Sequence, residues 1–376
     1  MRPEWQTANR IVIKVGSSLL VDEQRGCLRT EWLLSLAEDS AALKQEGKEV
    51  ILVASGAIAL GRQELALGTK KLALNEAQAA AAIGQISLNA AFKALFKSKQ
   101  IATAQILLTP DDTEDRRRYL NARDTINTLL QFSAVPVVNE NDTIATNELR
   151  YGDNDRLAAR VASMLEADVL IILSDIDGLY TAPPQQDETA EHIKEITQIT
   201  PEIEAMAGGT GSSFSSGGMV TKLMAAKIAN AAGCHMVITS GQGANPITAF
   251  LHEAKATWFL SSADKMQARK SWIAGALEIK GKITIDKGAQ KALYEGNSLL
   301  PAGVTAIEGT FNRGDVISIT TQEGKELGQG LSSYASEDAL QIIGKQSAEI
   351  ETILGYSGRS ELVHRDNMAY TKEKTE

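Results

Sequence analysis

The chain has 376 residues, of which 43% are hydrophobic and 23% charged, a composition that is ordinary for a globular protein of two or three domains. Its formal net charge of −9 is opposite in sign to the charge that nucleic-acid binding favours. Two cysteines and four histidines lack the spacing of a disulfide framework or a zinc site. With neither a secretory signal nor a run of about 18 apolar residues, we expect a cytoplasmic protein that does not enter a membrane.

The first 260 residues alternate short β-rich runs with helical patterns. Nearly continuous apolar runs, typical of buried parallel strands, occupy residues 11–15, 50–54, 101–108, 135–138, 169–173 and 236–239. Helical patterns occupy residues 31–45, 75–96, 119–131, 156–165 and 221–232. This alternation predicts an α/β fold, a three-layer αβα sandwich with a mainly parallel central sheet. Ligands of such sheets bind beyond the carboxyl ends of the strands, so the loops after the strands are the candidate sites.

The composition changes near residue 261. A charged helical stretch over residues 262–277 leads into short strands separated by glycines, which are typical of a small β-rich domain. We therefore predict four segments, the last of them a polar, frayed tail. They are an α/β domain over residues 1–260, a linker over 261–280, a small β-rich domain over 281–360 and the tail over 361–376.

Small and basic residues follow the first two predicted strands. Lys14 lies inside the first strand and is followed by Gly16 and two serines. A buried lysine is costly unless its ammonium group reaches solvent or meets an anion. The segment therefore fits either a phosphate contact or an edge strand whose lysine reaches solvent. Ser55 and Gly56 similarly fit either a close approach of ligand to backbone or a tight turn.

Acidic and amide side chains follow the later strands. Residues 139–143 can read the polar groups of a small ligand or form an Asx-rich turn. Residues 152–155, which open a helix, can cap it, orient lysines, or hold an ammonium group or magnesium. Ser174 and Asp175 come directly after a buried strand, where they suit a nucleotide, although the Asp-Gly pair nearby signals only a turn.

Gly217 and Gly218 precede a predicted helix, and Lys222 lies near its start. Free N–H groups and the helix dipole make such a start a site for anions. The dipole disfavours a lysine there, which indicates a ligand rather than helix stability, although a solvated loop remains the alternative. No Walker P-loop occurs in the chain. Two lysines, two glycine-rich loops and two acidic loops at one sheet edge fit phosphoryl transfer, and no Ser/His/Asp or Cys/His arrangement competes.

Six of these segments, in this order, resemble the amino-acid kinase superfamily and, within it, the glutamate 5-kinases. They are residues 13–17, 53–57, 139–142, 152–155, 174–180 and 217–222. The resemblance covers nearly the whole chain, and residues 281–360 resemble a PUA domain. It implies the amino-acid kinase fold and the phosphorylation of the γ-carboxylate of L-glutamate by ATP and Mg²⁺, the first step of proline biosynthesis. It also implies feedback inhibition by proline and a homo-oligomer, a dimer or a tetramer.

The resemblance also implies roles for individual residues. Lys14 and Lys222 would contact the phosphates and offset charge in the transition state, and Asp155 would orient the two lysines. The glutamate site would comprise Ser55, Asp142, Asp153 and Asn154. The ATP site would comprise Lys14, Gly16, Ser174, Asp175, Ser216, Gly217, Gly218, Met219, Val220, Thr221 and Lys222. No residue is assigned as a protein ligand of the metal.

Two other functions remain open at this point. A kinase of the same superfamily could act on N-acetylglutamate, aspartate, carbamate or a nucleoside monophosphate, but the Gly-Asp-Asn-Asp segment and the PUA-like region argue against this. A PUA-like domain could instead bind RNA. Residues 281–360 hold seven Lys/Arg and ten Asp/Glu, and this negative balance argues against phosphate-backbone binding. We therefore expect the PUA-like domain to be structural or regulatory.

Overall fold

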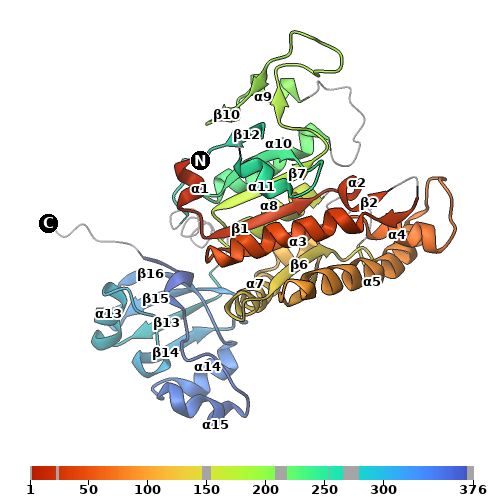
Figure 1. Ribbon diagram of the computed structural model, residues 1–376. Helices are drawn as coiled ribbons and strands as arrows, with labels where there is room; N and C mark the ends of the chain where they lie inside the picture. Colours follow the sequence, from red (N-terminus) through yellow and green to blue (C-terminus); the bar gives the residue numbers. More distant parts are fainter. Residues whose placement is uncertain are drawn as a thin grey trace. The chain divides into compact units, whose positions relative to one another are not determined.

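The chain divides into two compact units, Met1–Lys265 and Met266–Glu376, which are described separately. The structure, a computed structural model, describes residues 2–22, 25–145, 154–207, 218–252, 254–265 and 279–370. Figure 1 shows the helices and strands along the chain.

An eight-stranded sheet forms the centre of the first unit, in the order β10-β12-β11-β7-β1-β4-β6-β5 (Figure 1). The strands are β1 (Arg10–Val15), β4 (Glu49–Ala54), β5 (Thr103–Leu108), β6 (Val135–Glu140), β7 (Val169–Ser174), β10 (Glu195–Ile196), β11 (His235–Ser240) and β12 (Ala256–Phe259). All neighbouring pairs are parallel except β11 and β12. The prediction of a mainly parallel sheet is therefore confirmed.

Helices cover both faces of this sheet. One face packs against α3 (Thr30–Gln45), α5 (Leu74–Ser98) and α11 (Pro246–Leu251). The other packs against α7 (Arg116–Gln131), α8 (Asn154–Met164) and α10 (Met219–Ala231). The remaining elements are α1 (Pro3–Gln6), α2 (Ser17–Leu20), β2 (Val21–Asp22), β3 (Cys27–Leu28), α4 (Ala57–Glu64), α6 (Pro110–Glu114), β8 (Leu179–Tyr180), β9 (His192–Ile193) and α9 (Pro201–Met206). The predicted three-layer arrangement is confirmed, and most helices begin slightly earlier than the sequence pattern indicated.

The alternation of side chains along β1 determines which layer each one meets. Ile11, Ile13 and Val15 belong to the core shared with α3 and α5. Val12 belongs to the core shared with α8 and α10. Lys14 lies two residues after Val12, so its side chain is directed to the same layer.

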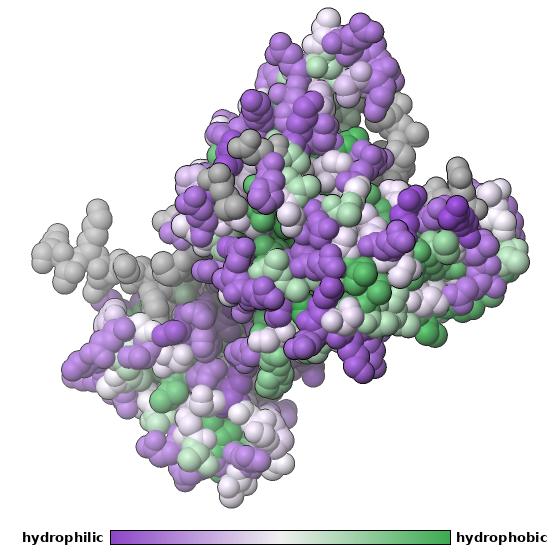
Figure 2. All heavy atoms as spheres, in the orientation of Figure 1, coloured by the Kyte–Doolittle hydropathy of each residue, from purple (hydrophilic) through white to green (hydrophobic). Residues whose placement is uncertain are grey.

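Helix α5 is long and apolar enough to cross a membrane by length and composition. Its Leu88, Phe92 and Phe96 are fully buried in the core of the first unit. On the face of the molecule shown in Figure 2, hydrophilic residues predominate and hydrophobic residues occur in small groups, as on most water-facing protein surfaces. Packing against the sheet thus accounts for the apolar residues on the buried face of α5.

The second unit is built on a five-stranded sheet in the order β14-β13-β15-β16-β17. Its elements are β13 (Gly281–Ile285), α13 (Lys287–Tyr294), η1 (Pro301–Gly303), β14 (Val304–Gly309), β15 (Val316–Thr321), β16 (Glu326–Leu331), α14 (Ser336–Ile342), η2 (Ser347–Glu349), α15 (Ile350–Leu354), η3 (Arg365–Asn367) and β17 (Met368–Tyr370). The predicted small β-rich domain is therefore present.

The predicted polar tail is wrong for its first ten residues, 361–370. Leu362 and Val363 are fully buried in the core of the second unit. Strand β17 pairs with β16 in antiparallel fashion. The hydrophobic residues of this stretch form only two short groups, residues 362–363 and 368–370, which are too short to show the periodicity of a strand.

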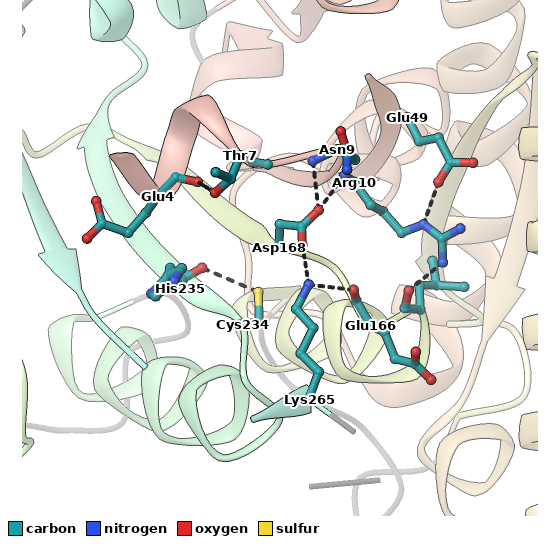
Figure 3. A network of polar contacts seen from close by, with 12 residues as sticks. Glu4, Thr7, Asn9, Arg10, Glu49, Glu166, Asp168, Cys234, His235 and Lys265 are labelled. Atoms are coloured by element: carbon teal, nitrogen blue, oxygen red, sulfur yellow. Dashed lines mark hydrogen bonds and ion pairs between the residues drawn. The ribbon is translucent and has the colours of Figure 1, made fainter. Parts of the chain in front are cut away.

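A polar network joins the amino ends of β1 and β7 to the end of the first unit (Figure 3). Asp168 accepts hydrogen bonds from the backbone N–H groups of Asn9 and Arg10, both at 2.8 Å. Its other carboxylate oxygen forms an ion pair with Lys265. Arg10 in turn donates to Glu49 at 2.6 Å. The network fixes the end of the sheet opposite the carboxyl ends of the strands.

Replacing Asp168 by asparagine should lower the free energy of unfolding of the first unit by about 1–3 kcal/mol at pH 7. Burial raises the pKa of Asp168, but the N–H groups of Arg10 and Asn9 and the ammonium group of Lys265 outweigh burial and hold it below 3.8. The carboxylate therefore contributes fully to the free energy of unfolding above pH 3.8. This contribution is lost as the pH falls through the lower pKa that Asp168 has in the folded protein. Denaturant titrations of wild type and Asp168→Asn over a range of pH check this. A difference in free energy of unfolding between the two proteins that does not narrow below pH 3.8 would contradict it.

Candidate active site

A cavity of about 920 Å³ lies at the carboxyl ends of β1, β4, β6 and β7. Because these four strands are parallel neighbours, their carboxyl ends meet at one edge of the sheet. The cavity is lined by many residues that the sequence pointed to: Lys14, Gly16, Ser55, Asp142, Asn154, Ser174, Asp175 and Lys222. The structure thus brings together loops that are far apart in the sequence.

Two lysines share one buried carboxylate at this cavity. Lys14 Nζ lies 2.6 Å from Asp155 Oδ1, and Lys222 Nζ lies 3.0 Å from Asp155 Oδ2. The exposed fractions of the Lys14, Asp155 and Lys222 side chains are only 7%, 0% and 3%. The three side chains together carry two positive charges and one negative charge. Ammonium groups at the wall of a cavity attract anions, so the arrangement favours an anionic ligand.

The two lysines keep Asp155 ionised. Burial raises the pKa of Asp155, but the charges of Lys14 and Lys222 and their hydrogen bonds outweigh burial and hold it below the usual value of 3.8. Asp155 is therefore a carboxylate at neutral pH. Its negative charge holds both ammonium groups at the wall of the cavity, where each can face a bound anion.

Three elements supply this group of charges. Lys14 comes from β1, which lies between β4 and β7 in the sheet, so the alternative of an edge-strand lysine is excluded. Asp155 lies in the first turn of α8. Lys222 is the fourth residue of α10, and α8 and α10 pack against each other. The face of β1 that carries Lys14 is the one that these two helices cover.

The start of α10 has the form expected of an anion site. Gly218 is its N-cap residue and makes no side-chain cap, and the Thr221 hydroxyl donates to the Gly218 carbonyl at 2.7 Å. Met219 and Val220 belong to the first turn. Neither they nor Gly218 and Thr221 are among the residues that line the cavity. Of the predicted site residues, Asp153, Ser216 and Gly217 lie outside the described residues.

The end of β7 forms another wall of the cavity. The Ser174 hydroxyl donates to the Asp175 carboxylate at 3.0 Å. The side-chain amide of Gln242 donates to the Asp175 carbonyl at 3.3 Å. Ser174 and Asp175 therefore line the same cavity as the two lysines, and the hydroxyl of Ser174 is oriented by the Asp175 carboxylate.

The opposite wall contains Ser55, Asp142 and Asn154. Gly56 follows Ser55 with φ +100° and forms the N-cap of α4, a left-handed conformation that favours glycine. The Asn154 side-chain amide donates to the Ala54 carbonyl at 2.5 Å. A hydroxyl, a carboxyl group and an amide thus line the same cavity as the lysine pair.

Several residues of the cavity had no site role assigned to them individually from the sequence. Strand β6 continues to Glu140 rather than ending at residue 138, so Asn139 and Glu140 line the cavity from the end of a strand. The run of polar residues over 139–143 indicated that both could contact a ligand. Arg62 and Thr69 also line the cavity, but they lie after the start of α4, where no motif marked them.

The cavity lining includes the carboxyl groups of Glu140, Asp142 and Asp175. Among the described parts of the chain, no three or more His, Cys, Asp or Glu side chains are grouped so that they could hold a metal. Magnesium usually keeps several waters and binds through one or two carboxylates plus substrate phosphates. The residues therefore fit a cation that arrives with a nucleotide rather than one held in a protein cage.

Comparison with known proteins agrees with this geometry. The model of the amino acid kinase family matches residues 9–240, and that of the PUA domain matches residues 281–354. Glutamate 5-kinase from Ruegeria sp. (strain TM1040) is 58% identical, over 96% of this chain and 98% of its own length. Glutamate 5-kinase from Agrobacterium fabrum (strain C58) is 57% identical, over 96% of this chain and 93% of its own length.

A solved structure shares the fold at much lower sequence identity. Carbamate kinase from Giardia lamblia bound to AMP-PNP has a TM-score of 0.50 and 17% identity, and the match covers 68% of this chain and 99% of that one. The two family models and the two relatives together cover both units. The chain therefore belongs to the amino acid kinase family, in its glutamate 5-kinase branch.

Proposed function

We propose that the chain transfers the γ-phosphoryl group of ATP to the γ-carboxylate of L-glutamate, which gives L-glutamyl 5-phosphate and begins proline biosynthesis. The observation that carries this proposal is the buried Lys14–Asp155–Lys222 group at a cavity with a polar second wall. The high identity to proteins named glutamate 5-kinase supports the choice of substrate.

The chemistry of this reaction suits the residues present. A γ-carboxylate with a reference pKa of about 4.3 is already ionised at neutral pH, so the nucleophile needs no general base. Nucleophile and triphosphate are both anionic, and their repulsion must be offset. Lys14, Lys222 and the N-terminus of α10 supply fixed positive charge for this purpose. Asp155 holds the two lysines in place and does not itself react.

The two substrates would occupy opposite walls of the cavity. ATP would lie against Gly16, Ser174, Asp175 and the segment from Ser216 to Lys222. Glutamate would lie against Ser55, Asp142, Asp153 and Asn154. This arrangement would bring the γ-carboxylate next to the γ-phosphate beside the lysine pair, with the attacking oxygen opposite the leaving oxygen, as in-line transfer requires.

Several finer features belong to the proposal. Mg²⁺ would bind with the ATP phosphates and neutralise part of their charge. The enzyme would be a cytoplasmic homo-oligomer. Its second unit would be structural or regulatory rather than RNA-binding. Proline would inhibit the enzyme at the glutamate site. Glutamate saturation curves recorded with and without proline test the inhibition, and unchanged curves would refute it.

Trapping with hydroxylamine tests the substrate. The protein is incubated with ATP, Mg²⁺ and hydroxylamine, and the acid is varied among glutamate, aspartate and N-acetylglutamate. We expect an acyl hydroxamate that depends on glutamate and on ATP. A signal with only aspartate or N-acetylglutamate would assign the chain to another kinase of the family.

A further inference from the structure

A chain of three side-chain amides runs from α5 to the glutamate wall of the cavity. Asn139 Nδ2 donates to Gln85 Oε1 at 2.8 Å. Asn139 Oδ1 accepts from Asn154 Nδ2 at 2.9 Å. Gln85 comes from α5 and Asn139 from the end of β6, whereas Asn154 begins α8. These hydrogen-bonded amides therefore connect α5, on one face of the sheet, with the glutamate wall of the cavity.

Two backbone groups determine which way each amide points. The Glu140 N–H donates to Asn139 Oδ1 at 2.8 Å, and since an N–H can only donate, this oxygen cannot be exchanged with Nδ2. The Ala54 carbonyl can only accept, so it requires Nδ2 of Asn154. Gln85 must then present its oxygen to Asn139. Its Nε2 is buried without a hydrogen-bond partner among the described residues, so the glutamine serves here as an acceptor.

This polarity decides what Asn154 offers to a ligand. Both hydrogens of its amide are used, one by Ala54 and one by Asn139. Its Oδ1 is the group left for the cavity that Asn154 lines. An amide oxygen accepts hydrogen bonds, and the α-ammonium group is the hydrogen-bond donor of ionised glutamate.

The position of α5 is set by backbone contact with α4. A Cβ at Gly84 would come within 1.9 Å of the Ala57 carbonyl oxygen, and one at Gly61 within 1.7 Å of the Ala80 carbonyl oxygen. The two helices therefore touch backbone to backbone directly beside Gln85. Because Ala57 begins α4, just after Ser55, this contact also ties α5 to the glutamate wall.

A second glutamine on α5 acts on the same wall. Gln78 lies seven residues before Gln85, two helical turns away on the same face. Its amide donates to the Ala145 carbonyl at 3.0 Å. Ala145 follows Asp142 in the loop after β6, so α5 holds both the strand end and the loop that line the glutamate side.

We propose that Gln85 is a positioning residue for the acceptor substrate: through Asn139 it fixes the amide of Asn154 so that Oδ1 accepts from the α-ammonium group of glutamate. This inference rests on the proposed function. Gln85 acts through two other side chains, and its effect falls on glutamate rather than on ATP.

Three variants of α5 test the inference. Gln85→Leu removes the acceptor and leaves a donor of Asn139 unpaired. Gln85→Glu keeps an acceptor oxygen toward Asn139 and puts a second carboxylate oxygen, with its negative charge, in place of the unpartnered Nε2. Asn89→Leu, one turn further along the same helix, makes the same change of an amide to leucine elsewhere on α5. Each is assayed for kcat and for the KM of glutamate, of ATP and of glutarate, which lacks the α-ammonium group, and its thermal unfolding is recorded.

We expect Gln85→Leu to raise the KM of glutamate roughly 10- to 100-fold, with the KM of ATP and of glutarate nearly unchanged. Gln85→Glu and Asn89→Leu should stay within about threefold of wild type. An unchanged KM of glutamate in Gln85→Leu, or an equal rise for glutarate, would overturn the inference. Wild-type protein that turns over another acid and not glutamate would overturn the proposed function instead. If that acid carries an α-ammonium group, as aspartate does, the same comparison on it still decides the role of Gln85.

Discussion

Replacing Lys222 by alanine is expected to lower kcat on the order of 10²- to 10³-fold, because a preorganised cation that faces developing charge is lost. The fold should survive this change. Asp155 stays paired with Lys14 at 2.6 Å, so no buried carboxylate is left alone. Steady-state kinetics with saturating glutamate and ATP measure the effect, and thermal unfolding shows that the protein is intact.

The matched control for this variant is Lys227→Ala. Lys227 lies on the same helix, but its side chain is half exposed and pairs with the exposed Glu204, and such surface pairs contribute little. Its kcat should equal that of wild type. Near-normal turnover of Lys222→Ala would remove this lysine from the mechanism.

Replacing Asp155 by alanine is expected to abolish measurable turnover and to lower the free energy of unfolding by about 3–5 kcal/mol, since two buried ammonium groups lose their common partner. Asp155→Asn, which keeps the shape, should lose activity to the same degree with a smaller loss of stability. Turnover is measured with both substrates saturating, and stability by denaturant titration.

Nucleotide binding gives a second readout for the Asp155 variants. ATP phosphates would supply the anion that the variant lacks, so a nonhydrolysable ATP analogue with Mg²⁺ should raise the Tm of Asp155→Ala more than that of wild type. Equal shifts in Tm, together with normal stability of the variant, would mean that Asp155 does not hold the lysines for phosphate binding.

The fold was largely predictable because its signals are periodic and local. Continuous apolar runs such as residues 169–173 indicate buried parallel strands, and the strand-helix alternation determines the layers. Lys14 and Lys222 were recognisable as site residues because neither stabilises the strand or helix that contains it. A lysine in a buried strand, or at a helix start behind two glycines, has no structural benefit there.

The remaining site residues could not be predicted because their roles depend on contacts across the sheet. Gln85 sits in an alanine-rich helix, and nothing local shows that its amide meets Asn139, 54 positions later in the chain. Arg62 lies inside a helix, away from any loop that follows a strand. The pairing of β17 with β16 likewise depends on a tertiary partner rather than on any pattern near residue 368.

An oxygen-18 transfer experiment tests the central claim, attack of the glutamate γ-carboxylate on the γ-phosphorus of ATP, most directly. Glutamate labelled in both γ-carboxylate oxygens is incubated with the protein, ATP and Mg²⁺, and the product is trapped with hydroxylamine. Hydroxylamine attacks the acyl carbon, so phosphate leaves with the bridging oxygen. We predict one labelled oxygen in each phosphate released by trapping. Phosphate free of label would show that water had attacked ATP instead and would contradict the proposed reaction.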